Sequence, residues 1–406
     1  MATQTHPPAS PDRITPARAR SAAALLVLVV IAALNLRPTI TTLGPLLPDV
    51  RDGLHMNGVM AGLLTSLPSA CFALFGPLAP ALARRFGLLG VLGGGLAAIT
   101  VGLLARAAAP TDAVFLLFTA LALAGIAVSN VLMPAIISRN FPDRIGTMTG
   151  LYAGIMAGGS AITAAVAVPV TGLLGGSWRE GLGVWALLSV GGAALALVLR
   201  DGRPAASARP AGASLRSSRT ARAMALFFGM CATAAYSLMG WMPQIYRDAG
   251  LSPTYAGLLL ALTMILGVPL SFLIPALAAH RDDQRPLVAV LMGCGVIAYA
   301  GLAFAPATLP WLWATLSGIA LSAFSLALTM LGLRSRTHEG VARLSSFAQS
   351  TGYLISIPGP LLIGVLYQHT GSWKPPIALL TALLVPQLLA GLRAARPGKI
   401  EDELTA

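Results

Sequence analysis

The chain consists of long apolar runs separated by short polar segments. Runs such as LLVLVVIAAL and AALALVL carry no charge and do not alternate between apolar and polar positions. A strand of a membrane β-barrel alternates over about ten residues, whereas a membrane-spanning helix needs about 20 mostly apolar residues in succession. The pattern therefore predicts helices that cross a bilayer and satisfy their own backbone hydrogen bonds.

Twelve such windows can be placed along the sequence. They fall at residues 22–46, 58–82, 88–108, 113–137, 145–170, 178–199, 222–245, 255–279, 286–305, 310–333, 342–366 and 374–395. The predicted fold is an all-α membrane protein with 12 transmembrane helices.

Composition excludes a set of soluble domains. The 406 residues are 56% hydrophobic and 10% charged, with a mean hydropathy of +0.78, whereas an average soluble domain is about 25% charged. Cys71, Cys231 and Cys294 all fall inside predicted spans. An odd number of cysteines at membrane depth argues against a disulfide framework or a metal site.

Basic residues gather on one side of the predicted topology. With the N-terminus placed in the cytoplasm, 21 Lys and Arg lie on the cytoplasmic side and Arg37 lies within the membrane. Five lie outside, namely Arg51, Arg106, Arg179, Arg247 and Lys374. This asymmetry follows the positive-inside rule and predicts that both termini are cytoplasmic. It also explains the net charge of +13 without nucleic acid as a partner.

The chain contains an internal repeat. A shift of 195 residues aligns Pro48 with Pro243, residues 61–64 with 256–259, and PALA at 80–83 with PALA at 275–278, with 12 identities in the 41 positions from 43 to 83. The predicted organisation is a disordered tail at 1–21, a six-helix half at 22–199, a linker at 200–221, a second half at 222–395 and a tail at 396–406. Such parallel halves rock about a site near the bilayer midplane.

The repeat and two motifs resemble the major facilitator superfamily. GPLAPALARRFG at 76–87 resembles its signature loop between the second and third helices, which implies gating roles for Gly76, Arg84 and Arg85. Pro80 or Ala81 stands where an aspartate is usual. NLRPTITTLGPLLPDV at 35–50 resembles the opening helix of the cyanate and 2-nitroimidazole permease branch. The resemblance implies a permease of the bacterial inner membrane.

Arg37 lies inside the first predicted span. If that span stopped before Arg37, residues 22–36 would reach only about 22 Å across a hydrocarbon core of about 30 Å. All 14 Asp and Glu lie outside the spans or near their ends, and Asp49 is nearest in sequence to Arg37. An arginine at the helix centre costs about 2.5–3.5 kcal/mol and needs partners. Its planar fork of donors suits an oxyanion, so we expect Arg37 to anchor a transported anion. Alternatively, it bonds neighbouring helices, and the two roles are compatible.

Further polar and aromatic residues are candidates for lining the central cavity. Pro38 is expected to kink the first helix beside the charge. The predicted substrate-binding residues beside Arg37 are Asn35, Asn130, Tyr152, Tyr236, Trp241, Gln349 and Tyr353, and weaker candidates are Ser66, Ser69, Ser160, Ser322 and Ser325. The amides are the stronger candidates, because a full amide in hydrocarbon requires partners.

No catalytic triad or metal-ligand cluster is apparent in the sequence, so we expect neither an enzyme nor a cofactor. The hypothesis is a monomeric secondary transporter that moves a small anionic or polar nitrogenous compound by alternating access. Multidrug or antibiotic efflux is an alternative, and a membrane sensor or scaffold without turnover is a weaker one. A co-transported proton could travel on the substrate or use Asp49, Asp52 or Glu180.

Overall fold

The fold is built from helices alone throughout the part of the chain that the structure describes. The computed structural model describes residues 16–199, 215 and 217–404, and these contain no strand. Twelve helical segments are long and apolar enough to cross a membrane, and each overlaps one predicted window. The all-α fold with 12 transmembrane helices is therefore confirmed.

The first half of the chain supplies six of the spanning segments. Its elements are α1 (Pro16–Asn35), α2 (Pro38–Thr41), α3 (Leu43–Gly53), α4 (Gly58–Phe75), η1 (Gly76–Leu78), α5 (Ala79–Phe86), α6 (Leu88–Ala107), α7 (Asp112–Asn140), η2 (Pro142–Arg144), α8 (Ile145–Leu173), α9 (Trp178–Gly183) and α10 (Ala186–Val198).

The second half supplies the other six. Its elements are α11 (Arg219–Asp248), α12 (Pro253–Ile265), α13 (Gly267–Ala279), α14 (Arg285–Phe304), α15 (Pro310–Leu321), α16 (Ala323–Leu333), α17 (His338–Ser356), α18 (Pro358–Thr370), α19 (Lys374–Ala394) and α20 (Ile400–Leu404).

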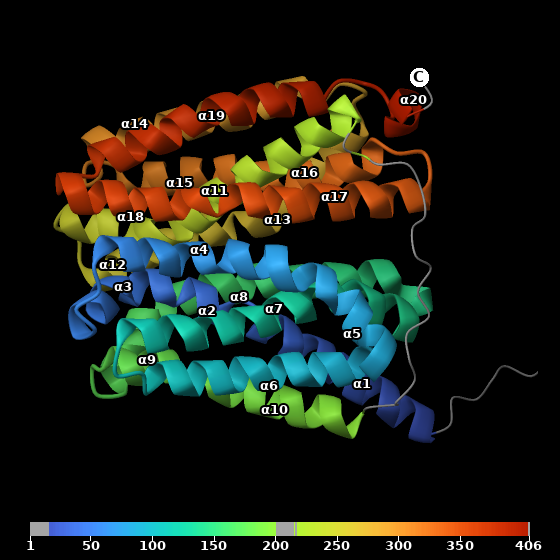
Figure 1. Ribbon diagram of the computed structural model, residues 1–406, viewed down its shortest axis with the longest axis horizontal. Helices are drawn as coiled ribbons and strands as arrows, with labels where there is room; N and C mark the ends of the chain where they lie inside the picture. Colours follow the sequence, from blue (N-terminus) through green and yellow to red (C-terminus); the bar gives the residue numbers. More distant parts are fainter. Residues whose placement is uncertain (1–15, 200–214, 216, 405–406) are drawn as a thin grey trace, which may run out of the picture.

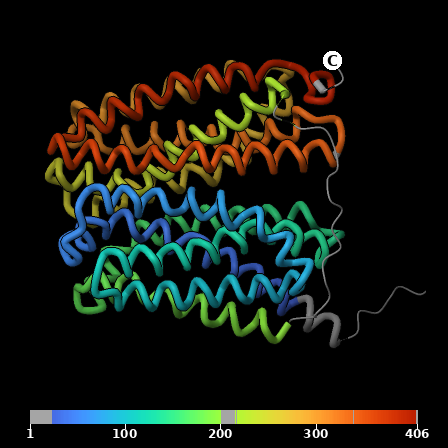
Figure 2. The backbone as a smooth tube through the Cα atoms, viewed as in Figure 1, coloured from blue at the N-terminus to red at the C-terminus, as the bar shows by residue number. Residues whose placement is uncertain are grey.

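The two halves lie side by side with their helices roughly along one direction (Figure 1). The backbone colours from blue to green stay in one half, and those from yellow-green to red stay in the other (Figure 2). We name the two ends of the bundle by their contents. The termini end holds the start of α1 and the short helix α20, and the Asp49 end holds the far end of α3.

The structure differs from the sequence prediction in parts of the two predicted tails. Residues 1–15 of the predicted tail, and 200–214 and 216 of the predicted linker, lie outside the described residues. Residues 16–21 belong to α1, because Pro16 suits a first helical position and the alanines after it favour helix. Within the second predicted tail, Ile400–Leu404 forms α20.

Helix α20 is stabilised by hydrogen bonds to the second half of the chain. The Glu403 carboxylate accepts hydrogen bonds from the Ser218 hydroxyl at 2.6 Å and the Thr220 amide at 3.0 Å, at the start of α11. Glu401 accepts a bond from the Ser335 hydroxyl at 2.5 Å. Tertiary contacts therefore order a segment too short to be helical by itself.

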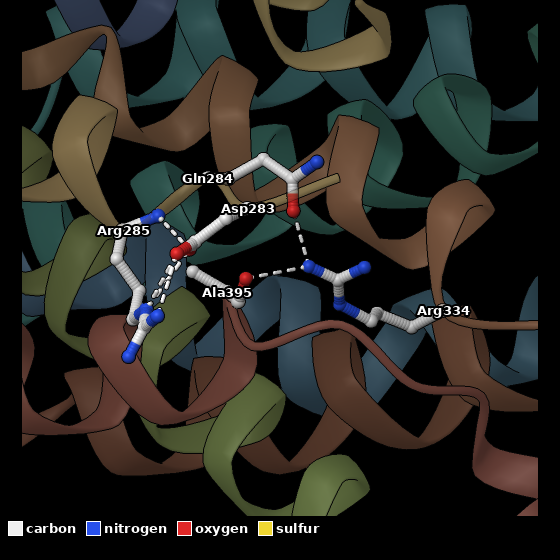
Figure 3. Close-up of polar contacts among 5 residues, drawn as sticks. All are labelled: Asp283, Gln284, Arg285, Arg334 and Ala395. Atoms are coloured by element: carbon white, nitrogen blue, oxygen red, sulfur yellow. Dashed lines mark hydrogen bonds and ion pairs between the residues drawn. The ribbon is translucent and has the colours of Figure 1, made fainter. Parts of the chain in front are cut away.

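A second polar cluster links three helices of this half at the termini end (Figure 3). The Arg334 side chain donates to the Ala394 and Ala395 carbonyls at 2.7 and 2.8 Å and to the Gln284 amide oxygen. Burial lowers the pKa of Arg334. Beside it, the side-chain hydrogen bonds of Arg285 lower the pKa of Asp283 to about 2. The ends of α14, α16 and α19 are thereby tied together.

Candidate functional site

The first spanning segment is interrupted at Arg37. α1 ends at Asn35 and α2 begins at Pro38, so Arg37 lies in the turn between them. Proline lacks a backbone N–H and its ring clashes with the preceding turn, which ends α1 here. The Arg37 carbonyl accepts bonds from the Ile40 and Thr41 amides, both at 3.0 Å, and from the Thr41 hydroxyl at 2.9 Å. The sequence predicted one kinked helix over 22–46, but the structure has three helices, of 20, 4 and 11 residues, joined by turns.

A cavity of about 430 Å³ lies beside Arg37 between the two halves. One wall comes from α4, α7 and α8, and the facing wall comes from α11, α12, α13, α15, α16 and α17. The volume falls within the range of about 300–1,000 Å³ that small-molecule sites occupy. The lining includes six predicted residues, which are Arg37, Asn130, Tyr152, Tyr236, Gln349 and Tyr353, together with Ser322 and Ser325.

Arg37 is the one charged side chain among the residues that line this cavity. Its Nε is buried without a hydrogen-bond partner, and none of the ion pairs among the described residues involves it. Tyr152, Tyr236 and Tyr353 line the same cavity. The cavity therefore presents one cation and several neutral polar groups, an arrangement suited to an anion or an electronegative group.

The polar groups around Arg37 are partly paired with one another. The Tyr152 hydroxyl donates to the Asn130 side-chain oxygen at 3.0 Å, which joins α8 to α7. The rings of Phe72 and Tyr353 stack across the two halves with centroids 5.1 Å apart. The first contact fixes the Tyr152 hydroxyl, and the second places a stacked aromatic pair in the cavity wall.

Two predicted binding residues do not reach the cavity. The Asn35 amide donates to the Ile31 carbonyl at 2.8 Å and to the Leu188 carbonyl at 3.2 Å, which joins α1 to α10. Trp241 is 1% exposed, and its indole N–H donates to the Pro360 carbonyl at 3.3 Å. Both polar groups are used in helix packing. Of the weaker candidates, Ser66, Ser69 and Ser160 also lie outside the lining.

The predicted gating residues lie at the termini end. α4 ends at Phe75, and a short 3₁₀ turn begins at Gly76 before the chain continues as α5. Arg84 and Arg85 are exposed, and the Arg85 guanidinium lies 5.2 Å from the Phe86 ring centre. The ion pairs of the described chain include neither arginine, as expected from the missing aspartate.

An ion pair that the sequence did not predict joins the halves at the Asp49 end. Arg247 on α11 pairs with Asp49 on α3, with both nitrogen–oxygen distances at 3.2 Å and side-chain exposures of 21% and 43%. Arg51 donates to Gln244 across the same boundary at 3.1 Å. Asp49 and Arg247 are 198 residues apart, so only the tertiary structure brings them together.

Glycines let the helices meet closely beside this ion pair. A Cβ added at Gly58 would lie 2.6 Å from the Gly364 carbonyl oxygen, and one added at Gly364 would collide with the Gly58 carbonyl. The backbones of α4 and α18 are therefore in direct contact. Together with the Asp49–Arg247 pair, this contact joins the two halves at the Asp49 end.

The sequence did not predict the buried position of a second cation, Arg106. Its side chain is 0% exposed in the last turn of α6. Its Nη1 donates to the Thr39 carbonyl at 3.2 Å, and its Nε and Nη2 have no partner. The sequence signal was weak, because Arg106 lies two residues from the end of its predicted window.

These features define a class of protein. Two six-helix halves meet at a cavity that contains one cation and several polar groups, and contacts between the halves join them at one end of that interface. This is the architecture of a secondary transporter that exposes one site alternately to the two sides of a membrane.

The chain belongs to the Major Facilitator Superfamily, whose sequence profile matches residues 25–360. It is 36% identical to the uncharacterized transporter YycB of Bacillus subtilis (strain 168), covering 92% of this chain and 93% of that protein. It is 33% identical to the 2-nitroimidazole transporter of Escherichia coli (strain K12), with coverages of 93% and 96%. It is 31% identical to the cyanate transport protein CynX of the same organism, with coverages of 91% and 97%.

Solved structures agree with the fold. The crystal structure of the nucleoside transporter NupG superposes with a TM-score of 0.74 at 15% identity, and the match covers 92% of this chain and 98% of that one. The chain is therefore a multi-pass secondary transporter of the Major Facilitator Superfamily, with a small molecule as its substrate and the lipid bilayer as its surroundings.

Proposed function

We propose that the chain moves a small anionic or polar nitrogenous compound across the bacterial inner membrane, with Arg37 as the substrate anchor. The observation that carries this proposal is the position of one cation, without a protein counterion, in the wall of a cavity that both halves share. A half-buried guanidinium whose Nε has no protein partner favours a ligand that brings its own negative or electronegative atoms.

The shape of the site supports a planar ligand. A carboxylate or a nitro group presents two coplanar oxygens, which match the fork of Arg37. The Phe72–Tyr353 stack offers an aromatic face in the same cavity. Two relatives of this chain are named for 2-nitroimidazole and for cyanate, and one of these is a planar ring compound and the other a small anion.

Alternating access supplies the transport cycle. In this state the Asp49–Arg247 pair and the Gly58–Gly364 contact hold the Asp49 end closed. Opening that end requires both contacts to separate while the halves rock about the site. Because Arg37 lies in a fixed turn of the first half, it stays with the substrate while the facing wall moves.

Efflux of larger apolar compounds is the second candidate. The observation that favours it is the apolar part of the wall, which includes Phe72, Met156, Met239, Met264 and Phe324. Methionines adapt to ligands of different shapes. This alternative assigns Arg37 no direct contact with the substrate, so the two candidates differ in the ligands that they select.

Orientation and coupling complete the proposal. The positive-inside rule supports a cytoplasmic position for both termini, and the Asp49 end is then the outer one. A co-transported proton could travel on the substrate. Asp49, another predicted carrier, is paired with Arg247, so its protonation would weaken the closed outer end. We expect the working unit to be a monomer, because each chain contains a complete cavity.

The test is a ligand screen with purified protein in lipid nanodiscs. Thermal shifts are measured with cyanate, 2-nitroimidazole, imidazole, benzoate and a panel of large cationic drugs. Stabilisation by nitro compounds or anions, with little effect of imidazole, supports the proposal. Stabilisation by the large drugs alone would favour efflux and overturn it. Uptake of a radiolabelled hit into proteoliposomes, with and without a pH gradient, then reports transport and coupling.

A further inference from the structure

A second large cavity lies outside the substrate cavity, within the first half. It is a groove of about 590 Å³ between α5, α6 and α7, and it shares no residue with the cavity beside Arg37. Gly90, Gly94 and Ala98 line its α6 wall at spacings of four residues, which places them on one face of that helix. A Cβ added at Gly94 would meet no atom within 4 Å. The groove is thus about 12 Å long between Gly90 and Ala98 at 1.5 Å per residue.

The groove opens on the lipid-facing surface. Phe86 at its rim is 53% exposed, and Leu82 beside it is 36% exposed. Farther along the same helices, Val101 on α6 and Leu117 on α7 are 53% and 64% exposed. In a membrane-spanning protein, exposed apolar side chains at this depth contact hydrocarbon. Apart from Arg85, the side chains that line the groove are apolar, or the residue is glycine, so an acyl chain suits it better than water.

The mouth of the groove carries a positive charge. Arg85 lines it at the termini end, in the last turn of α5, with Arg84 next in the chain. The ion pairs of the described residues include neither side chain. Basic pockets between transmembrane helices on the cytoplasmic side bind anionic lipid headgroups, and arginine forms strong bonds to phosphate.

We propose that this groove binds an anionic phospholipid. One acyl chain lies along Gly90, Gly94 and Ala98, and the headgroup phosphate contacts the Arg85 guanidinium. The lipid then bridges α5 to α6 and α7 at the termini end. The lipid replaces the missing acidic residue of the loop at 76–87 as the negative partner of its arginines. The inference stands apart from the identity of the transported substrate.

The experiment measures lipid binding by native mass spectrometry of delipidated protein in detergent. Phosphatidylglycerol and phosphatidylcholine with identical acyl chains compete for the protein. One arginine near a headgroup gives a preference of about fivefold for the anionic lipid. Arg85→Gln should abolish this preference, whereas Gly94→Leu, which fills the groove, should reduce the binding of both lipids.

Matched controls separate the groove from general effects. Arg281→Gln removes an exposed charge from the same end of the other half. Gly332→Leu adds the same side chain to an exposed helix position where a Cβ also meets no atom within 4 Å. Both controls should keep the fivefold preference. Glycerol phosphate should not displace the bound lipid, because it lacks the acyl chain.

Three results would overturn the proposal. They are equal binding of the two lipids by the wild type, an anionic preference that survives Arg85→Gln, and a loss of binding in Gly94→Leu that Gly332→Leu reproduces. Because the readout is lipid binding, these outcomes do not depend on whether Arg37 contacts a substrate.

Discussion

Replacement of Arg37 by glutamine separates the two roles that this side chain can have. As an anchor, Arg37 binds the ligand and lowers the stability of the ligand-free protein. As a structural group, it stabilises the empty protein. The structure supports the first role, since Nε is buried without a partner and the ion pairs of the described residues do not include Arg37. The two roles predict opposite changes in the melting temperature of the ligand-free protein.

The expected loss of affinity follows from the chemistry of the contact. A hydrogen bond to a charged group contributes about 1.5–3 kcal/mol. At 1.4 kcal/mol per factor of ten, Arg37→Gln should weaken the binding of a nitro compound or anion about 12- to 140-fold. Without ligand, the melting temperature should hold or rise, because a charge at membrane depth costs about 2.5–3.5 kcal/mol. Arg37→Lys should recover part of the affinity, since it restores the charge without the planar fork.

The assay is isothermal calorimetry for affinity and thermal unfolding for stability, both in nanodiscs. Arg393→Gln is the matched control, because Arg393 is exposed in the last turn of α19 and far from the cavity. It should change neither quantity. Unchanged affinity in Arg37→Gln, together with a melting temperature several degrees lower, would refute the anchor role and support the structural one.

Three further predictions concern the Asp49 end and the C-terminal helix. Asp49→Arg reverses one charge of the Asp49–Arg247 pair and should impair transport in proteoliposomes, and adding Arg247→Asp should restore it. If the double variant transports no faster than the single variants, the ion pair does not control the Asp49 end. Gly364→Ala should separate α18 from α4 at the Asp49 end, so a cysteine introduced there should react faster with a thiol reagent. Gly293→Ala is the control, because a Cβ at Gly293 meets no atom within 4 Å. Hydrogen bonds from Ser218 and Thr220 lower the pKa of Glu403 against the opposing effect of burial. This stabilisation of α20 is therefore complete at neutral pH and is lost as pH falls below the ordinary glutamate pKa of about 4.3. Limited proteolysis of the C-terminus should show this loss, and Glu403→Gln should show it already at pH 7.

The cavity shows how far prediction from sequence extends. Six of the eight predicted binding residues line it, because polar and aromatic residues at membrane depth face the bundle interior. Asn35 and Trp241 lie elsewhere because a buried amide or indole can equally be satisfied by a neighbouring helix. Hydrophobic periodicity is weak in helices that are apolar on every side, so the facing partner of each polar group is not readable from sequence.

The Asp49–Arg247 ion pair shows the opposite case. Asp49 and Arg247 each resemble an ordinary charged residue at a helix end, and no local pattern marks them as partners. The buried position of Arg106 was missed for a related reason. A long flexible side chain near a helix end can extend toward water or fold back into the bundle, and the choice depends on what the neighbouring helices offer, here the Thr39 carbonyl.

The sequence by itself established twelve spans, an internal repeat and one arginine at membrane depth. It could do so because the hydrocarbon core imposes a fixed length, apolar composition and internal hydrogen bonding on every span. The tertiary structure decided which polar groups share the cavity and which charges join the halves. Those features depend on contacts between helices far apart in the chain, and the bilayer places no requirement on the sequence that would reveal them.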